Sequence, residues 1–199
     1  MPQTNSTYEQ AIAKGQEYMA LHMKPSRRAH TENVVKTARE LSERFGADPL
    51  KAEVAAWFHD LVRNLDDGEL NGYIDAFGID PRYKNNRNLS HGRIAAALMK
   101  RDFGIDDEDI LQAVIYHTTG RSGMSPLEKV IFLADVIEPG RTHPSADETR
   151  KLAESDLDRA CLFALEQTIA YVAARGEPLD KDTEEARADL AEKTGEVNV

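Results

Sequence analysis

Four histidines constrain the fold of this chain more than any other feature. Each lies at the end of an apolar stripe with helical spacing, and successive members are 29, 32 and 26 residues apart: His30, His59, His91 and His117. A separation of about one helical hairpin lets each helix bring one imidazole to the inner side of a bundle. We therefore expect an all-α fold in which the four rings face a shared cavity.

Two aspartates are expected on the same inner side. Asp60 directly follows His59, and adjacent residues of a helix point about 100° apart, so both reach one cavity only near a helix end. Asp135 directly follows the apolar run from Val130 to Ala134, where a carboxylate is costly unless it is paired or binds a metal. A single His-Asp pair arises easily by chance, so the hypothesis depends on the whole set.

Apolar stripes, capping residues before them and glycines after them predict about eight helices. The expected ranges are about 8–22, 27–45, 49–59, 70–77, 91–103, 106–117, 126–135 and 155–175, with residues 182–191 weakly helical. We expect Asp48 to cap the third of these helices and Ser90 the fifth. The segments 79–89, 118–123 and 138–144 are expected to be loops, and residues 1–7 and 194–199 to be polar tails. No segment has the alternating pattern of a strand.

Length and charge narrow the class of protein. A chain of 199 residues predicts one domain, 1–199, with its core at about 12–190. The net charge of -10 argues against a nucleic-acid partner, so a phosphorylated ligand must find positive charge locally. Cys161, the single cysteine, lies in an apolar helical run and is interpreted as a core residue. The chain has no apolar run near the length of a membrane span and no signal-peptide core, so we expect a cytoplasmic protein with no membrane partner.

Imidazole and carboxylate groups together are typical of a transition-metal site. The candidate ligands are His30, His59, Asp60, His91, His117 and Asp135. This combination suits iron, manganese, zinc, nickel or cobalt, whereas magnesium prefers oxygen ligands alone. Two metals bridged by Asp60 would use all six groups. One metal would need only His30, His59, Asp60 and Asp135, which leaves the other two histidines for substrate phosphate or a second ion.

The order of these residues resembles the HD-domain metal-dependent phosphohydrolase superfamily. Local strings are similar to those of its YqeK-type branch, the symmetrical diadenosine tetraphosphate hydrolases. They are Arg27-x-x-His30, His91-Gly92, Tyr116-His117-Thr118-Thr119-Gly120-Arg121-x-Gly123-Met124, Leu133-Ala134-Asp135 and Ile137-Glu138-Pro139-Gly140-Arg141. The His-Thr-Thr-Gly-Arg and Glu-Pro-Gly-Arg strings are the specific ones, and the similarity covers about residues 12–190.

The resemblance implies an all-helical HD domain that holds one or two iron ions, with manganese, nickel, cobalt or zinc as alternatives. It implies cleavage of diadenosine tetraphosphate into two ADP molecules, for which we expect a metal-bound hydroxide as nucleophile. It also implies that one group of residues contacts the nucleotide phosphates or the metal: Arg27, His30, His91, His117, Thr118, Asp135 and Arg141.

The catalytic step is expected to depend on Asp60, Arg63, His91 and His117. Arg63, Arg121 and Arg141 are candidates for stabilising charge on the leaving phosphate, although an arginine in the 118–123 loop is as often a solvated surface residue. Two positions depart from the family. Arg63 stands where lysine is frequent, and the nucleotide contact expected at Arg187 lies in Ala186-Arg187-Ala188, where the family tends to have Ala-Arg-Asn.

Other functions share this ligand order. Phosphomonoesterases, cyclic phosphodiesterases, deoxynucleotide triphosphohydrolases and guanosine tetraphosphate hydrolases belong to the same superfamily. A nucleotide-sensing module that binds without turnover is the alternative from a different class. The partner expected in each case is a small nucleotide, here a dinucleoside polyphosphate with ADP as product, and the chain is expected to be a monomer or a homodimer.

Overall fold

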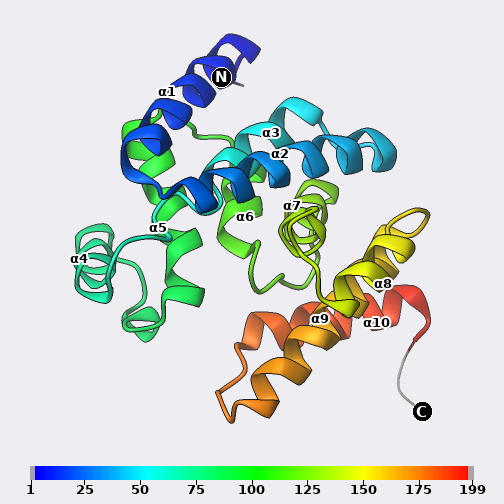
Figure 1. Ribbon diagram of the computed structural model, residues 1–199. Helices are drawn as coiled ribbons and strands as arrows, with labels where there is room; N and C mark the ends of the chain where they lie inside the picture. The colour runs from blue at the N-terminus through cyan, green and yellow to red at the C-terminus, as the bar shows by residue number, and fades with distance from the viewer. Residues whose placement is uncertain (1–2, 197–199) are drawn as a thin grey trace.

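The computed structural model describes residues 3–196, and the regular structure of this range is entirely helical (Figure 1). Ten α-helices and one 3-10 turn follow one another: α1 Asn5–His22, α2 Pro25–Phe45, α3 Pro49–Phe58, α4 Asp67–Phe77, η1 Pro81–Tyr83, α5 Arg87–Asp102, α6 Glu108–Tyr116, α7 Pro126–Ile137, α8 Pro144–Leu152, α9 Leu157–Ala174 and α10 Lys181–Thr194. The predicted all-α class is confirmed. The parts of the expected tails at residues 1–2 and 197–199 lie outside the described residues.

Helix starts follow the capping chemistry of the sequence at most places. The side chain of Asp48 accepts the backbone N–H groups of Leu50 and Lys51 at 2.9 and 3.1 Å, and Pro49 occupies the first turn of α3. Ser125 forms a capping box with Glu128 at the start of α7. These starts position two helices of the functional site.

Three boundaries differ from the prediction. Asn86 rather than Ser90 caps α5, because its side chain accepts the N–H of Leu89 one turn earlier. At the N-terminus, Thr4 caps α1 and the helix begins at Asn5, inside the segment expected to be a polar tail. Thr194 belongs to α10 instead of a frayed end, and its hydroxyl donates to Leu190 O at 2.9 Å.

The sequence prediction missed one helix near the C-terminus and gave another too little helical character. No helix was expected between residue 144 and residue 155, but α8 lies there; it is capped by His143 and buries only Ala146 and Thr149. A mostly charged helix of this kind has a stripe too narrow to recognise from periodicity. The weakly helical segment is the full helix α10, which packs against α9 and buries Thr183, Ala186, Leu190 and Ala191.

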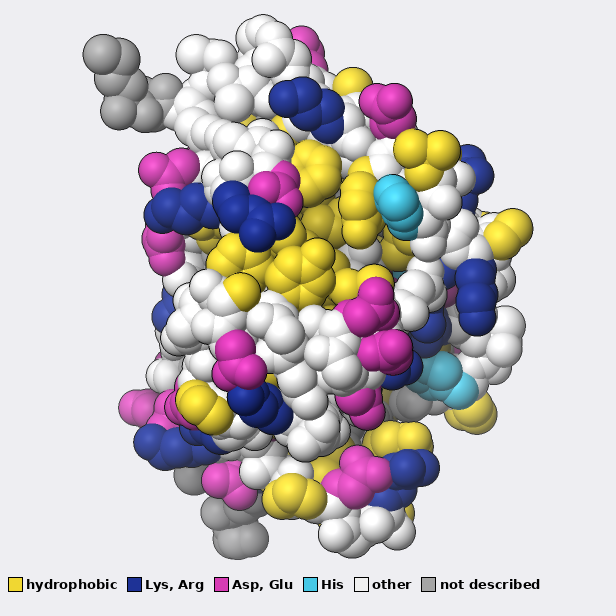
Figure 2. All heavy atoms as spheres, turned by 90° about the vertical axis from the view of Figure 1, so that its left-hand side faces the viewer, with side chains coloured by type: hydrophobic (Ala, Val, Ile, Leu, Met, Phe, Trp, Pro, Cys, Tyr) yellow, Lys and Arg dark blue, Asp and Glu magenta, His cyan; other side chains and the backbone are white. Residues whose placement is uncertain are grey.

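The centre of the bundle is α7, which is buried from Leu127 to Ala134 and at Ile137. It packs against α2, α3, α6, α8 and α9, and α2 and α3 lie above it with α9 and α10 below in Figure 1. One continuous apolar core runs from Tyr8 to Ala191 and includes the thiol of Cys161. Figure 2 shows the face of α1, α4 and α5, where apolar side chains gather between charged ones. Within residues 3–196 no helix combines the length and apolar character needed to cross a membrane.

Candidate metal centre

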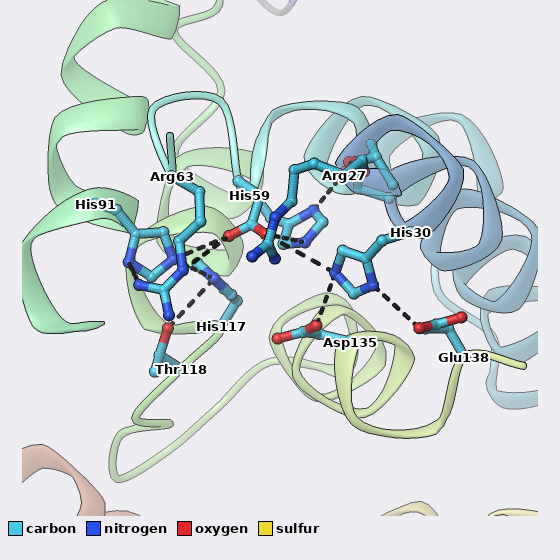
Figure 3. A network of polar contacts seen from close by, with 12 residues as sticks. Arg27, His30, His59, Arg63, His91, His117, Thr118, Asp135 and Glu138 are labelled. Atoms are coloured by element: carbon cyan, nitrogen blue, oxygen red, sulfur yellow. Dashed lines mark hydrogen bonds and ion pairs between the residues drawn. The ribbon is translucent and has the colours of Figure 1, made fainter. Parts of the chain in front are cut away.

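Six predicted ligands converge from five places in the chain, in the middle of the bundle (Figure 3). His30 comes from α2, His59 and Asp60 from the turn after α3, and His91 from α5. His117 follows the last residue of α6, and Asp135 lies in the last turn of α7. The helix end matters here because it allows the adjacent His59 and Asp60 side chains to reach the same cluster of ligand atoms.

The ligands form two groups that share Asp60. One group is His30, His59 and Asp60, the other is Asp60, His91 and His117, and within each the ligand atoms lie within 4.8 Å of one another. Asp60 Oδ2 lies 3.8 Å from His30 Nε2 and 3.8 Å from His59 Nε2, whereas Oδ1 lies 3.3 Å from His91 Nε2. Each carboxylate oxygen therefore faces a different group, which is the arrangement of a bridging ligand.

Asp135 joins the first group through His30. Its Oδ1 atom lies 3.1 Å from His30 Nε2, but the contact lacks the geometry of a hydrogen bond. Figure 3 shows both side chains pointing toward the space between α2 and α7. The first group thus offers two imidazoles and two carboxylates, and the second offers two imidazoles and the other oxygen of Asp60.

Local hydrogen bonds orient three of the imidazole rings. The Nδ1–H groups of His59, His91 and His117 donate to Ala56 O, Arg87 O and Val114 O, each at 2.7 Å. These acceptors lie three or four residues earlier, at the spacing of one helical turn, so the helix itself directs each ring. The Nε2 atom of each ring keeps its lone pair for the cavity, as in most histidine ligands of metals.

A carboxylate outside the predicted set orients the fourth ring. His30 Nδ1 donates to Glu138 Oε1 at 3.1 Å, and Glu138 Oε2 accepts from Asn33 Nδ2 at 3.1 Å and from Gly140 N at 2.5 Å. Glu138 is almost fully buried. Sequence reasoning quoted this residue in a family string without giving it a role. Its contact with His30 spans 108 residues and has no signal in local periodicity.

The polar atoms that face the cavity fit a divalent cation. The Nε2 atoms of His30 and His59 are buried and have no hydrogen-bond partner within the described residues. The Nε2 atoms of His91 and His117 face each other at 2.9 Å, with both Nδ1 protons already donated elsewhere. Two opposed lone pairs repel each other unless a cation or a proton lies with them. Nitrogen and carboxylate donors together suit a divalent transition metal.

Burial and charge set the protonation states that metal binding requires. Burial lowers the pKa of His59, and burial together with the neighbouring His91 lowers the pKa of His117 to about 3. Burial alone would raise the pKa values of Asp60 and Asp135, but the surrounding imidazoles, and Arg141 at Asp135, bring both well below the usual range. Asp60 and Asp135 are therefore ionised at neutral pH and His117 is neutral, which are the forms that bind a metal.

Three arginines surround the carboxylates. Arg27 Nη1 donates to Asp60 Oδ2 at 3.0 Å, Arg63 Nε lies 4.0 Å from Asp60 Oδ1, and Arg141 Nη2 donates to Asp135 Oδ1 at 2.6 Å. Their side chains are 36%, 24% and 38% exposed, so an anion from solvent can reach each guanidinium. The hydroxyl of Thr118 lies 3.2 Å from His117 Nε2, at the same opening. Positive charge is therefore local, as an acidic chain requires for a phosphorylated ligand.

Two predicted site residues lie apart from this cluster. Arg121 forms a two-point ion pair with the buried carboxylate of Glu128, at 2.6 and 2.9 Å, so it holds the start of α7. Arg187 lies on α10 with its Nε atom 3.9 Å from Glu166 Oε1. Neither arginine contacts a candidate metal ligand in the interactions of the described residues.

Comparisons with known proteins agree with this geometry. The family model "HD domain" matches residues 27–140, which include all six candidate ligands. The chain is 42% identical to "Bis(5'-nucleosyl)-tetraphosphatase, symmetrical" of Bacillus subtilis, over 88% of this chain and 92% of that protein. It is 35% identical to the protein of the same name from Staphylococcus aureus, over 72% and 75% of the two chains. The crystal structure of a predicted HD superfamily hydrolase involved in NAD metabolism, from Clostridium acetobutylicum, superposes with a TM-score of 0.86 at 37% identity, over 91% of this chain and 97% of that chain.

Proposed function

The chain belongs to the HD domain family, and from this membership and the geometry of the site we propose that it hydrolyses diadenosine tetraphosphate symmetrically to two ADP molecules. The observation that carries the proposal is Asp60, whose two oxygens face two different groups of imidazoles beside Arg27 and Arg63. A polyphosphate needs such local cationic charge in a chain with a net charge of -10.

The cofactor we propose is iron, as one or two ions, and Asp60 would be the ligand that the two groups share; manganese, nickel, cobalt and zinc are the alternatives. His30, His59 and Asp135 would complete the first group, and His91 and His117 the second. When bound, the divalent metal supplies an activated water and neutralises charge on phosphate oxygens. Occupancy by two ions is supported by the way in which Asp60 divides its oxygens between the groups.

The protein's own groups bind and orient the polyphosphate. Arg27, Arg63 and Arg141 surround the centre with partly exposed guanidinium groups that can pair with phosphate oxygens and stabilise the charge of the departing ADP. The Thr118 hydroxyl is placed to donate to an oxygen beside His117. Arg121 and Arg187 are already paired with Glu128 and Glu166, so the proposal gives the phosphate contacts to the other three arginines.

We extend the proposal to the organisation of the chain. One apolar core includes residues from α1 to α10, which supports a single domain over 1–199. The cytoplasmic location and the monomeric or homodimeric state expected from the sequence stay predictions.

Metal analysis and product identification test the function together. The purified protein is analysed for iron, manganese, cobalt, nickel and zinc, and is then supplied with each metal and with diadenosine tetraphosphate. We expect ADP as the single nucleotide product. AMP with ATP, or free phosphate from nucleotide monophosphates alone, would point to another hydrolase of the superfamily. Binding without turnover under every metal would point to a sensing module.

A control variant links product formation to the centre. Asp60→Ala removes the ligand shared by both groups, so we expect loss of bound metal and of hydrolysis together. Full activity in this variant would contradict the proposal that hydrolysis depends on the metal centre. Arg121→Lys serves as the matched change of a predicted residue outside the cluster, and we expect it to keep both metal and activity.

A further inference from the structure

A cavity of about 580 Å³ opens directly beside the metal centre, between α7, α8 and α9. It shares Asp135 and Arg141 with the centre and continues away from it along Gln167, Thr168 and Tyr171 of α9. The volume lies within the range of small-molecule sites in proteins, about 300–1,000 Å³. The cavity therefore has the size and the position of a ligand subsite.

The residues around the cavity combine an aromatic ring with polar groups. Tyr171 is 62% exposed and is one of two large apolar side chains in the described range with such exposure. The guanidinium of Arg175 lies over the Tyr171 ring, 5.5 Å from its centroid, so a stacked base would use the opposite face of the ring. Gln167 presents an exposed carboxamide one turn before it, with both a donor and an acceptor. Ala164 and Val136 add apolar groups to the lining of the cavity.

Arg141 marks the boundary between the cavity and the metal centre. Its guanidinium donates to Asp135 Oδ1 and to Asp135 O, at 2.6 and 3.0 Å, and its side chain is 38% exposed. An arginine guanidinium carries its positive charge at any working pH, so a cation stands between the cavity and the metal centre. A phosphate bound to Arg141 would therefore lie between the metal centre and the cavity.

We propose that this cavity binds the nucleoside of one ADP half of the substrate, with the adenine stacked on Tyr171 and its edge hydrogen-bonded by Gln167. The inference rests on the proposed function. Symmetrical cleavage breaks the bond between the second and third phosphates, so only two phosphates separate the reacting bond from either ribose. The nucleoside must then lie directly beside the metal centre, and a cavity that shares Asp135 and Arg141 meets this condition.

A second cavity lacks the features that a nucleoside subsite needs. It measures about 560 Å³ and is lined by Glu166, Glu184 and Arg187 with apolar residues of α9. It contains two carboxylates and shares no residue with the metal centre, so it offers neither charge complementarity nor proximity to a polyphosphate. The contrast favours the cavity at Tyr171 for the nucleoside.

Titration calorimetry with two ligands separates a nucleoside subsite from a phosphate site. The full-length chain loaded with Mn²⁺ is titrated with ADP and, separately, with inorganic pyrophosphate. We expect Tyr171→Ala to weaken ADP binding about tenfold, within the range for stacking of a base on an aromatic ring, and Tyr171→Phe to retain it. Gln167→Ala should weaken ADP binding by a smaller factor. Pyrophosphate affinity should not change in any of these variants.

The control is Leu21→Ala, which removes the other exposed apolar side chain, on α1, and should leave both affinities unchanged. ADP affinity that is unchanged in Tyr171→Ala and Gln167→Ala would overturn the proposal, as would an equal loss for ADP and pyrophosphate. Because these are binding measurements, they remain decisive for the subsite even if the protein fails to cleave diadenosine tetraphosphate. That failure would count against the proposed function alone.

Discussion

Gly92 of α5 approaches the backbone of α6 so closely that a Cβ atom at this position would lie 2.5 Å from the carbonyl oxygen of Val114. The same Cβ would lie 3.2 Å from Cε1 of His117. Val114 O is the acceptor that orients His117, and His91 is the neighbour of Gly92 in the chain. A missing side chain therefore allows the two helices to place His91 and His117 together.

Replacement of Gly92 by alanine should separate these helices. We expect Gly92→Ala to destabilise the protein by about 2 kcal/mol, because the strain of overpacking exceeds the gain in helix propensity. Metal affinity should fall with it, since His91 and His117 move apart. Urea unfolding and metal titration measure the two effects. Gly72→Ala in α4 is the control: its Cβ would meet nothing within 4 Å, so that variant should be unchanged or slightly more stable. Equal behaviour of the two variants would contradict the prediction.

Glu138 should act on the metal through His30. Its two oxygens accept from three donors, and an amide in its place cannot serve as acceptor at both ends. We expect Glu138→Gln to lower metal affinity about tenfold, the lower end for a residue that orients a metal ligand. Metal titration of the metal-free protein checks this. The control is Glu148→Gln, which changes an exposed carboxylate of α8 and should leave metal affinity as it is. Unaltered metal affinity in Glu138→Gln would show that Glu138 does not orient His30 for metal binding.

The pH dependence of stability should report on Asp107, the cap of α6. Burial would raise the pKa of Asp107, but Lys51 at 2.8 Å and the Tyr8 hydroxyl at 2.6 Å lower it overall. A carboxyl whose pKa is lowered by folding stabilises the protein above its unfolded pKa of about 3.9, and this contribution is lost as the pH falls through the folded pKa.

Asp107→Asn isolates that contribution, because asparagine is as good a helix cap as aspartate. We expect the variant to be less stable than the parent by about 1 kcal/mol at pH 7, an amount kept small by partial exposure of the ion pair. The difference should shrink as the pH falls below about 3.9, because the unfolded parent takes up a proton first and folded Asp107 loses its charge only at lower pH. Urea midpoints from pH 7 to pH 3 measure it. A difference that stays constant over this range would rule out the ionic origin.

Two arginines of the predicted site should differ in what they affect. Arg141→Ala should raise the KM for diadenosine tetraphosphate about tenfold, as expected for loss of a charged hydrogen bond to phosphate. Arg121→Ala should instead lower stability by about 2 kcal/mol, because it leaves the buried Glu128 without its cation. Steady-state kinetics and thermal unfolding of both variants test the distinction. A large increase in KM in Arg121→Ala would instead indicate that Arg121 contacts the substrate.

The contrast between these arginines shows how far sequence reasoning extends. Both belong to strings shared with the family, and both were expected near a phosphate. Which carboxylate each one meets is decided by packing: Asp135 for Arg141 and Glu128 for Arg121. The charged helix α8 was not predicted for a related reason, since only the few residues that it buries distinguish it from a loop.

The sequence by itself determined the all-α class and the helices that carry the histidines, because the 3.6-residue period and the capping side chains are local properties of the chain. Tertiary structure alone decided that Asp60 faces two groups at once, that Glu138 orients His30 from 108 residues away, and that Gly92 lets α5 and α6 meet. The physical reason is that the distances from ligand atoms to a metal must be correct to within a few tenths of an ångström. Such agreement depends on how helices pack against each other, and no local pattern encodes it.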